Sequence, residues 1–326
     1  MELPTELRAA IDEAASAIPQ RELQALSEAL SRRYRSESGT GRSLIGREAE
    51  VTAYAAVRMP ATYAAVRSAL SESMRSGLHI RTMLDVGAGA GAAGWAAVME
   101  LDELKELRCV EREAGMLRLG ERLMRSSAAF DGIQLDWSCA DARDAGAISH
   151  ADLVTASYMM NEMSPDARAG LLDRLWDAAD QMLLIIEPGT PEGFAQLREA
   201  RRRILERGGH VAAPCPHEAA CPISGDDWCH FTCRVARSRL HRLIKGGDAP
   251  YEDEKFMYMA FTREDAARCQ ARVRRHPLIE PGRITLELCA RDGLQRRMVT
   301  KRDKALFKAA RKASCGDAFG TDAGAE

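Results

Sequence analysis

The sequence predicts an α/β fold with a parallel sheet at its centre. Between residues 78 and 207, short apolar runs alternate with stretches of helical pattern, and a strand followed by a crossover helix is the repeating unit of parallel sheets. A glycine-rich turn follows the first apolar run, and an acidic residue stands at or just after the end of each of the first three runs. Ligands of such sheets bind at the carboxyl ends of the strands, so these residues also predict a cofactor site.

Residues 1–77 are predicted to form an N-terminal helical region. Apolar residues recur every three or four positions on both sides of Pro19, which indicates two amphipathic helices. The glycines and serines of 36–43 predict a linker. Residues 47–76 have a further helical pattern, which we expect to break near Pro60 because proline lacks the amide that a helix needs.

Residues 78–207 are predicted to form the sheet and its crossover helices. Each strand is a short apolar run, and each helix is a longer stretch with apolar residues at helical spacing. The expected strands are 82–86, 107–111, 133–137, 151–157 and 182–187, and the expected helices are 92–101, 114–126, 165–180 and one that ends at Arg207.

The turn after the first strand contains Gly87, Gly89 and Gly91. Glycine can adopt positive φ and lets a ligand approach the backbone where a Cβ would clash. The following helix directs its N-terminal amides toward whatever binds over the turn, so the segment predicts a nucleotide-type cofactor site. Because the spacing from Gly87 to Ala92 also fits the dinucleotide fingerprint, the glycines do not identify the cofactor.

Three acidic residues indicate which cofactor binds. Asp85 stands two residues before Gly87, where a dinucleotide fold has apolar strand, and this resembles the first motif of class I S-adenosylmethionine (SAM) methyltransferases. In that class the acid serves the methionine end of SAM. Glu111 ends the second strand at the spacing of a carboxylate that binds ribose hydroxyls. Asp141 follows the third strand, where the class places an adenine contact. The three acids together favour SAM over NAD.

A cysteine-rich loop follows the sheet within the predicted region 208–250. Cys215, Cys221 and Cys229 lie within 15 residues, and the first two are each followed by a proline that stiffens the loop. Their spacing differs from that of common zinc fingers but suits thiolates held around a metal or cluster, and it does not separate iron–sulfur from zinc. The candidates for a fourth ligand are Cys289, Cys233, His217 and His230.

The C-terminal part is predicted to complete the sheet and to end in a basic helix and a tail. The assignments are a basic helix from Arg234 to Lys245, strands 255–262 and 283–289 paired antiparallel at the sheet edge within the region 251–313, a basic helix over 301–312, and a disordered tail at 314–326.

The net charge of −2 conceals an asymmetry along the chain. Residues 198–312 contain 26 Lys and Arg against 15 Asp and Glu, a net charge of +11, which leaves −13 on the remainder. A basic half indicates a polyanionic partner such as RNA, with solvated helix faces as the alternative. The chain has no run of about 18 apolar residues, so we expect no membrane span. Its first residues lack a targeting pattern, so we expect a cytoplasmic protein.

Several segments in this order resemble the bacterial and mitochondrial family of methyltransferase-like small-ribosomal-subunit assembly proteins. They are Met59–Tyr63, Asp85–Gly89, Ser157–Glu162, Glu187–Pro191, the Cys-Pro-His to Trp-Cys-His-Phe block at 215–231, and Tyr251–Phe256. The resemblance implies a class I Rossmann-like fold that binds SAM and carries an iron–sulfur insertion. By position it implies SAM contacts at Asp85, Gly87, Gly89, Gly91, Glu111 and Asp141, and a [4Fe–4S] cluster on Cys215, Cys221, Cys229 and Cys289.

The resemblance also implies binding to the ribosomal RNA of the maturing small subunit. We therefore expect an rRNA-binding assembly factor. A monomer is the default expectation for the oligomeric state, which the sequence does not determine. One alternative is an active SAM-dependent rRNA methyltransferase, and a more remote one is a small-molecule methyltransferase. No residue stands out as a general base, so the catalytic residues are not assigned. Cys233 departs from the family pattern, because similar sequences tend to have glutamine there. It is therefore an alternative to Cys289 as the fourth cluster ligand.

Overall fold

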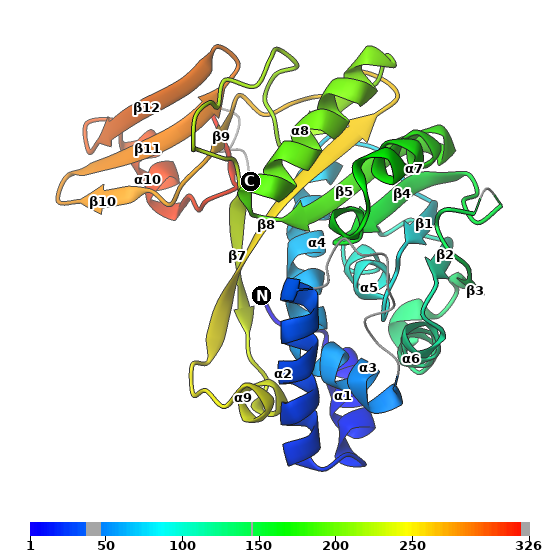
Figure 1. Cartoon of the computed structure of the whole chain (residues 1–326). Coiled ribbons are helices and arrows are strands. Elements are labelled where there is room, and N and C mark those ends of the chain that lie inside the picture. The colour runs from blue at the N-terminus through cyan, green and yellow to red at the C-terminus, as the bar shows by residue number, and fades with distance from the viewer. Residues whose placement is uncertain (37–46, 145, 321–326) are drawn as a thin grey trace. The chain divides into compact units, whose positions relative to one another are not determined.

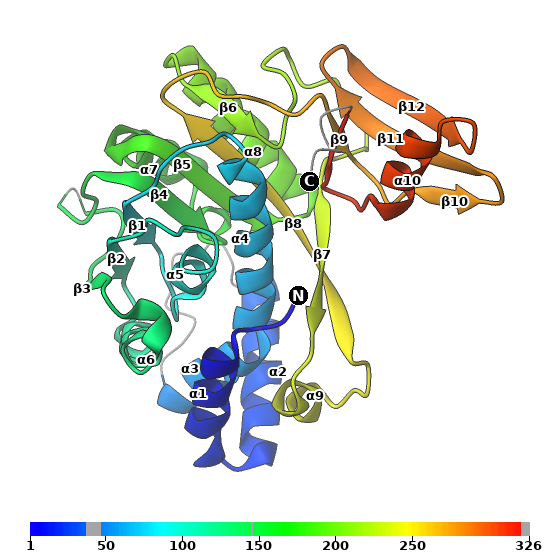
Figure 2. The same cartoon turned by 180° about the vertical axis from the view of Figure 1, so that it is seen from behind.

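The computed structural model describes residues 1–36, 47–144 and 146–320 (Figures 1 and 2). Apart from its first residue, the predicted linker at 36–43 lies outside these ranges. The chain forms two compact units. The first comprises Met1–Leu70, His79–Ile186 and Cys233–Glu254, and the second comprises Ser71–Leu78, Glu187–Thr232 and Lys255–Glu326.

The N-terminal region is helical, as predicted. It contains α1 (Thr5–Ser16), α2 (Gln20–Ser36), α3 (Glu48–Val57) and α4 (Met59–Met74). Helix α1 buries Leu7, Ile11 and Ala15 on one face, and α3 contacts α1 and α2. Pro60 is the second residue of α4, where its missing amide would have no partner in the helix, so it separates α3 from α4 as expected.

The first unit contains five parallel strands of an eight-stranded sheet, which confirms the predicted Rossmann-like α/β fold. Its strands are β1 (Thr82–Val86), β2 (Glu106–Glu111), β3 (Gln134–Cys139), β4 (Ala151–Ser157) and β5 (Ala179–Pro188), in the order β3-β2-β1-β4-β5. The connecting helices are α5 (Ala92–Ala97), α6 (Ala114–Arg125) and α7 (Pro165–Ala178), with short 3-10 turns at Ala128–Phe130 and Met160–Glu162.

The strand order reverses between β1 and β4, and this reversal positions the candidate site. Residue Asp85 on β1 lies opposite Cys109 on β2 and Thr155 on β4. Figures 1 and 2 show α7 on one face of the sheet and α5 on the other. In open α/β sheets, ligands bind outside the carboxyl ends of the strands at such a switch point.

The chain continues through α8 (Pro191–Glu206), β6 (His210–Ala213), β7 (Phe231–Ala236), α9 (Arg239–Lys245) and β8 (Tyr251–Thr262). Strand β6 pairs antiparallel with the end of β8, and β7 also pairs with β8. The predicted helix from Arg234 to Lys245 is therefore wrong over its first five residues. Phe231, Cys233 and Val235 are buried at alternate positions, and this period of two is that of a strand.

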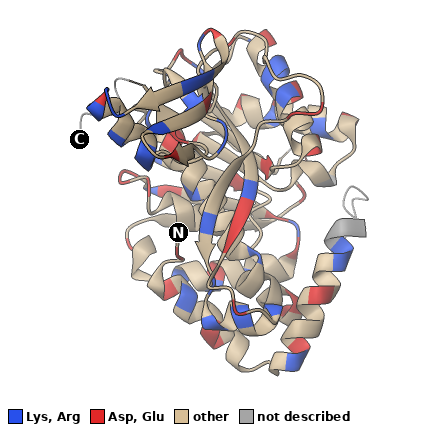
Figure 3. Ribbon diagram, turned by 90° about the vertical axis from the view of Figure 1, so that its left-hand side faces the viewer, with Lys and Arg blue, Asp and Glu red and all other residues tan. Residues whose placement is uncertain are grey.

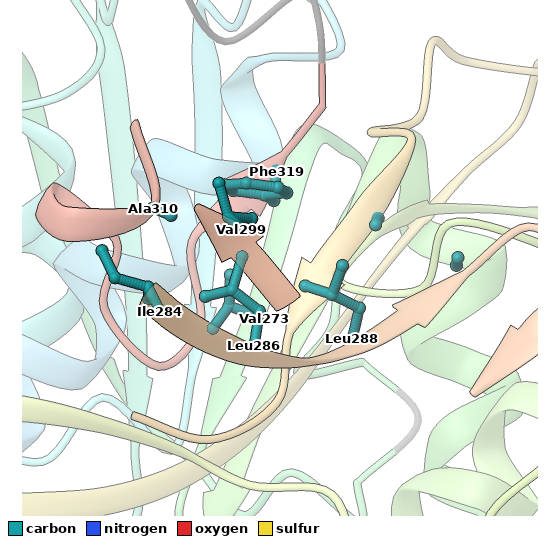
Figure 4. Close-up of a cluster of buried hydrophobic side chains, with 9 residues drawn as sticks. Val273, Ile284, Leu286, Leu288, Val299, Ala310 and Phe319 are labelled. Atoms are coloured by element: carbon teal, nitrogen blue, oxygen red, sulfur yellow. The ribbon is translucent and has the colours of Figure 1, made fainter. Parts of the chain in front are cut away.

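The second unit has a separate five-stranded sheet with a helix on one face. It consists of β9 (Ala271–Val273), β10 (Leu278–Glu280), β11 (Arg283–Ala290), β12 (Gly293–Thr300) and β13 (Ala318–Phe319), with α10 (Lys304–Lys312) packed on β11 and β12. The predicted pairing of 255–262 with 283–289 is wrong, because β11 pairs with β9, β10 and β12. Alternate residues of β11, namely Ile284, Leu286 and Leu288, form a separate core with Val299 and Phe319 (Figure 4).

The predicted tail is structured in its described part. Ala318–Phe319 pairs with β9, because Phe319 is buried in the core of the small sheet; residues 321–326 lie outside the described ranges. Among the helices that the structure describes, none has an apolar stretch of the length that crossing a bilayer requires.

Candidate functional site

Asp85 is buried at the carboxyl end of β1. Only 1% of the residue is exposed, and its carboxylate accepts a hydrogen bond of 2.7 Å from the Thr155 hydroxyl. Burial raises the pKa of Asp85 to about 7; the Thr155 hydrogen bond opposes this rise, and the charge of Glu111 adds to it. A buried carboxylate that is only partly ionised at neutral pH is prepared to pair with a cationic group of a ligand.

The glycine turn after β1 requires glycine at the predicted positions. Gly87, Gly89 and Gly91 have φ of 72°, 57° and 87°. A Cβ on Gly87 would lie 2.8 Å from Sδ of Met159, whereas a Cβ on Gly89 would meet no atom within 4 Å. The backbone at Gly89 is therefore open to close approach by a ligand.

Glu111 supports the turn from the end of β2. Its carboxylate accepts hydrogen bonds from the amides of Gly89 (2.7 Å) and Glu113 (2.8 Å). Burial raises the pKa of Glu111, and these two hydrogen bonds oppose the rise. The structure thus brings Asp85, the glycine turn and Glu111 together.

Asp141 lies after the end of β3 and pairs with Arg143. Its carboxylate accepts from Nε (2.9 Å) and Nη2 (2.6 Å) of Arg143. These hydrogen bonds lower the pKa of Asp141 to about 2. Asp141 is therefore a surface carboxylate held by a neighbouring arginine, one strand beyond Glu111 in the sheet.

The segment after β4, which carries part of the family resemblance, contributes polar groups at the end of this strand. Tyr158 has a φ of 57°, which is rare for a residue other than glycine, and its hydroxyl lies 3.1 Å from the Glu254 carboxylate. The side-chain oxygens of Ser157 and Asn161 are buried without a hydrogen-bond partner in the part of the chain that the structure describes. Ser157 stands at the end of β4, beside the switch point.

Gly89→Ala tests the role of the turn in ligand binding. We expect SAM affinity to fall at least about tenfold because the Cβ enters the open space over the turn. Folding stability should fall by roughly 1–2 kcal/mol, because an alanine takes a left-handed conformation there. Gly132→Ala is the matched control: Gly132 also has positive φ (80°) and an open Cβ position. Titration calorimetry with SAM should show normal binding by that variant, and equal loss in both would contradict a cofactor role for the turn.

The second unit brings four of the predicted cysteines together. Cys215, Cys221 and Cys229 lie in the loop between β6 and β7, and Cys289 lies on β11. Burial raises the thiol pKa of Cys215 to about 11 and of Cys289 to about 12. The charges of Cys215 and Cys221 raise the thiol pKa of Cys289 further. The charges of Cys215, Cys221 and Cys289 likewise raise the thiol pKa of Cys229. The four thiols therefore lie close enough for their charges to interact.

The other candidate ligands have different positions. His217 lies next to the set, with Nε2 3.7 Å from Sγ of Cys289. Cys233 is on β7 in the first unit, and burial followed by the charge of Glu254 raises its pKa to about 12. Cys233 does not share a helix face with Cys229, four residues earlier, because Phe231–Ala236 is a strand. Cys269 was missed; its charge acts on Cys289.

The surroundings of the four cysteines fit a thiolate-bound metal centre. Nδ1 of His217 and of His230 and Nε of Arg201 and of Arg274 are buried without a hydrogen-bond partner in the described chain. The charge of Arg201 acts on Cys215, and that of Arg274 acts on Cys229 and Cys289. Buried donors of this kind need an acceptor, and metal-bound thiolates and sulfides are acceptors.

The chain is similar to three curated proteins that are larger than itself. It is 29% identical over 291 residues to the human protein named "Ribosome assembly protein METTL17, mitochondrial", a match covering 81% of this chain and 61% of the relative. It is 23% identical over 215 residues to each of two fission yeast proteins, named Rsm22-cox11 tandem proteins 1 and 2, covering 51% of this chain and 29% of each relative. The matches thus span less than two thirds of the length of these relatives.

Solved structures with a comparable chain trace include methyltransferases. Magnesium protoporphyrin IX methyltransferase (ChlM) from Synechocystis, determined with bound SAM, is 12% identical with a TM-score of 0.43, covering 74% of this chain and 97% of that one. The plantazolicin methyltransferase BpumL has a TM-score of 0.43 at 11% identity, covering 75% and 98%. Residues 48–320 match the model of one family, so the chain belongs to the family described as mitochondrial small ribosomal subunit Rsm22.

Proposed function

We propose that this protein is an assembly factor of the small ribosomal subunit that binds SAM in the first unit and a [4Fe–4S] cluster in the second. One observation carries the proposal. The family match over residues 48–320 includes every residue of both candidate sites, from Asp85 to Cys289. The human relative that aligns with 81% of the chain is itself named a ribosome assembly protein.

The geometry of the first unit supports SAM as the ligand. The buried Asp85 would pair with the ammonium group of the methionine end, and Glu111 would fix the glycine turn through the Gly89 amide. Among the described residues around this turn we assign groups that orient a ligand and assign no general base. Transfer to an already nucleophilic ring nitrogen would need only such orientation, so this arrangement keeps methyl transfer as the second candidate function.

The cysteine set supports a cluster as the second group. Cys215, Cys221 and Cys229 would hold it from the loop, and Cys289 would hold it from β11. The cluster would tie the loop to the small sheet, and a structural metal site of this kind contributes folding free energy. Zinc on the same four thiolates is the alternative that metal analysis distinguishes.

The small sheet and α10 offer a basic surface for RNA. Figure 3 shows Lys and Arg on the segments beside the C-terminus. The exposed basic residues there include Arg296, Arg297, Lys301, Arg302, Lys304, Lys308, Arg311 and Lys312. Contacts of such residues with phosphates supply sequence-independent affinity that decreases with salt.

Charge reversal on α10 tests the RNA face. We expect Lys304→Glu/Lys308→Glu/Arg311→Glu to lower co-sedimentation with small subunits at least about tenfold and to reduce its salt dependence, because each lost phosphate contact lowers the slope. Lys105→Glu, an exposed lysine in the first unit, is the control and should bind normally. Undiminished co-sedimentation of the triple variant would contradict the assignment of this face.

A further inference from the structure

Three arginines in the second unit are buried, which is unusual for this residue type. Arg201 on α8, Arg272 on β9 and Arg274 directly after β9 are 6%, 3% and 5% exposed. A buried guanidinium needs acceptors and negative charge to offset the loss of water. The groups that these arginines contact therefore indicate what the region is built to hold.

Arg201 holds the part of the loop between the first two cysteines. Its Nη2 donates to the carbonyl oxygens of His217 (3.0 Å) and Ala219 (2.8 Å), which lie between Cys215 and Cys221. Both acceptors are neutral, so they satisfy hydrogen bonds without balancing the charge.

Arg272 holds the start of the same loop. Its Nε donates to the Pro214 carbonyl (2.9 Å) and its Nη1 to the Gly316 carbonyl (2.9 Å). The guanidinium also forms an ion pair with Glu72. Its charge is therefore compensated, and its role is to fix the backbone directly before Cys215.

Arg274 holds the loop on the other side, close to Cys229. It forms an ion pair with Asp227, two residues before this cysteine. The same carboxylate also accepts from Nη2 of Arg275 at 2.6 Å. Two guanidinium groups therefore share one negative charge.

The buried charges of Arg201 and Arg274 are the ones that these contacts leave incompletely balanced. Arg201 donates to two carbonyl oxygens, and Arg274 shares the Asp227 carboxylate with Arg275. In the described chain, Nε of Arg201 and Nε of Arg274 are buried without a hydrogen-bond partner. Buried guanidinium groups with unused donors favour an anionic group beside them.

We propose that Arg201 and Arg274 position the cysteine loop and stabilise the negative charge of the cluster, thereby raising its reduction potential. The inference rests on the proposed cluster and deepens it. A cluster on four thiolates is anionic and becomes more so when it accepts an electron. Nearby positive charge and N–H donors stabilise the reduced form more than the oxidised form, so they shift the potential upward.

The test compares reduction potentials of the full chain after anaerobic reconstitution. The variants are Arg201→Gln, Arg274→Gln, Arg201→Lys and the control Arg202→Gln. Arg202 is on the same helix, 54% exposed and paired with Glu199 and Glu206. Iron and acid-labile sulfide are measured first, and the potential is then determined by redox titration followed by electron paramagnetic resonance.

We expect both glutamine variants to have a more negative potential than wild type. Arg201→Lys, which keeps the charge, should shift less than Arg201→Gln, and Arg202→Gln should not shift. If the arginines only stabilised the fold, their replacement would change the amount of bound cluster but would not produce this ranking of reduction potentials. Wild-type potentials in glutamine variants that hold a full cluster would overturn the inference. Wild-type protein without iron and sulfide would overturn the cluster proposal itself, which separates the two failures.

Discussion

Replacing Cys215 with serine should remove nearly all iron and acid-labile sulfide from protein purified without oxygen. The wild-type protein should be brown and absorb broadly near ~400 nm, as iron–sulfur proteins do. Because the cluster would tie the loop to β11, the variant should also be less soluble and less stable toward denaturant by several kcal/mol. Metal analysis and chemical denaturation measure the two effects.

Cys233→Ser is the matched control for this loss. Cys233 is also a buried cysteine, but its pKa responds to burial and to the charge of Glu254 and not to the four-cysteine set. The variant should keep its iron. Loss of iron in Cys233→Ser with retention in Cys289→Ser would make Cys233 the fourth ligand. A colourless wild-type protein with one zinc per chain would exclude the cluster.

Asp85→Asn should stabilise the ligand-free protein above neutral pH while it abolishes SAM binding. The pKa of Asp85 is raised to about 7 in the folded state, so ionisation costs more in the folded than in the unfolded chain. The loss of folding free energy that this ionisation causes in the wild type begins above the unfolded pKa of about 4 and is complete above pH 7. We expect the variant to gain on the order of 1–4 kcal/mol at pH 8 and to converge with wild type near pH 4.

Asp141→Asn provides a control of opposite sign. The pKa of Asp141 is lowered to about 2 by Arg143, so its ionised form contributes stability that is present above the unfolded pKa and lost as pH falls toward 2. This variant should lose stability at neutral pH. Thermal unfolding with and without SAM across pH 4–8 compares the two. An Asp85→Asn protein that is destabilised at every pH and still binds SAM would contradict the cofactor role.

The first unit could be predicted because its signals are local. The glycines at 87, 89 and 91 adopt positive φ within a single turn, and β1 buries four of its five residues. A sequence reveals such a turn directly because few other residues tolerate that conformation. The end of β7 was mistaken for a helix because Arg234 and Arg237 continue the basic pattern of α9, and the buried alternation of Phe231, Cys233 and Val235 is short.

The small sheet was missed because β12 is mostly exposed and β9 is short and pairs with a distant part of the chain. Strand β12 buries only Val299, so it lacks the apolar alternation that marks a half-buried strand. Strand β9 has only three residues. It pairs with β11 and also with β13, which lies near the end of the described chain. The buried arginines could not be predicted either, since Arg201 is part of the basic run on α8, and a run of this kind is usually solvated.

The central claim is that the protein acts in small-subunit assembly. It is tested by comparing ribosomes from three kinds of cell: cells that lack the protein, and the same cells supplied with either the wild-type protein or Asp85→Asn. Gradient profiles and a map of small-subunit rRNA methylation are measured together. The account predicts that cells without the protein accumulate immature small subunits that carry every methyl mark. Supplying the wild-type protein should restore normal small subunits. One methyl group lost at a single position, restored by wild type but not by Asp85→Asn, would show an enzyme instead. Normal small-subunit profiles without the protein would contradict the account.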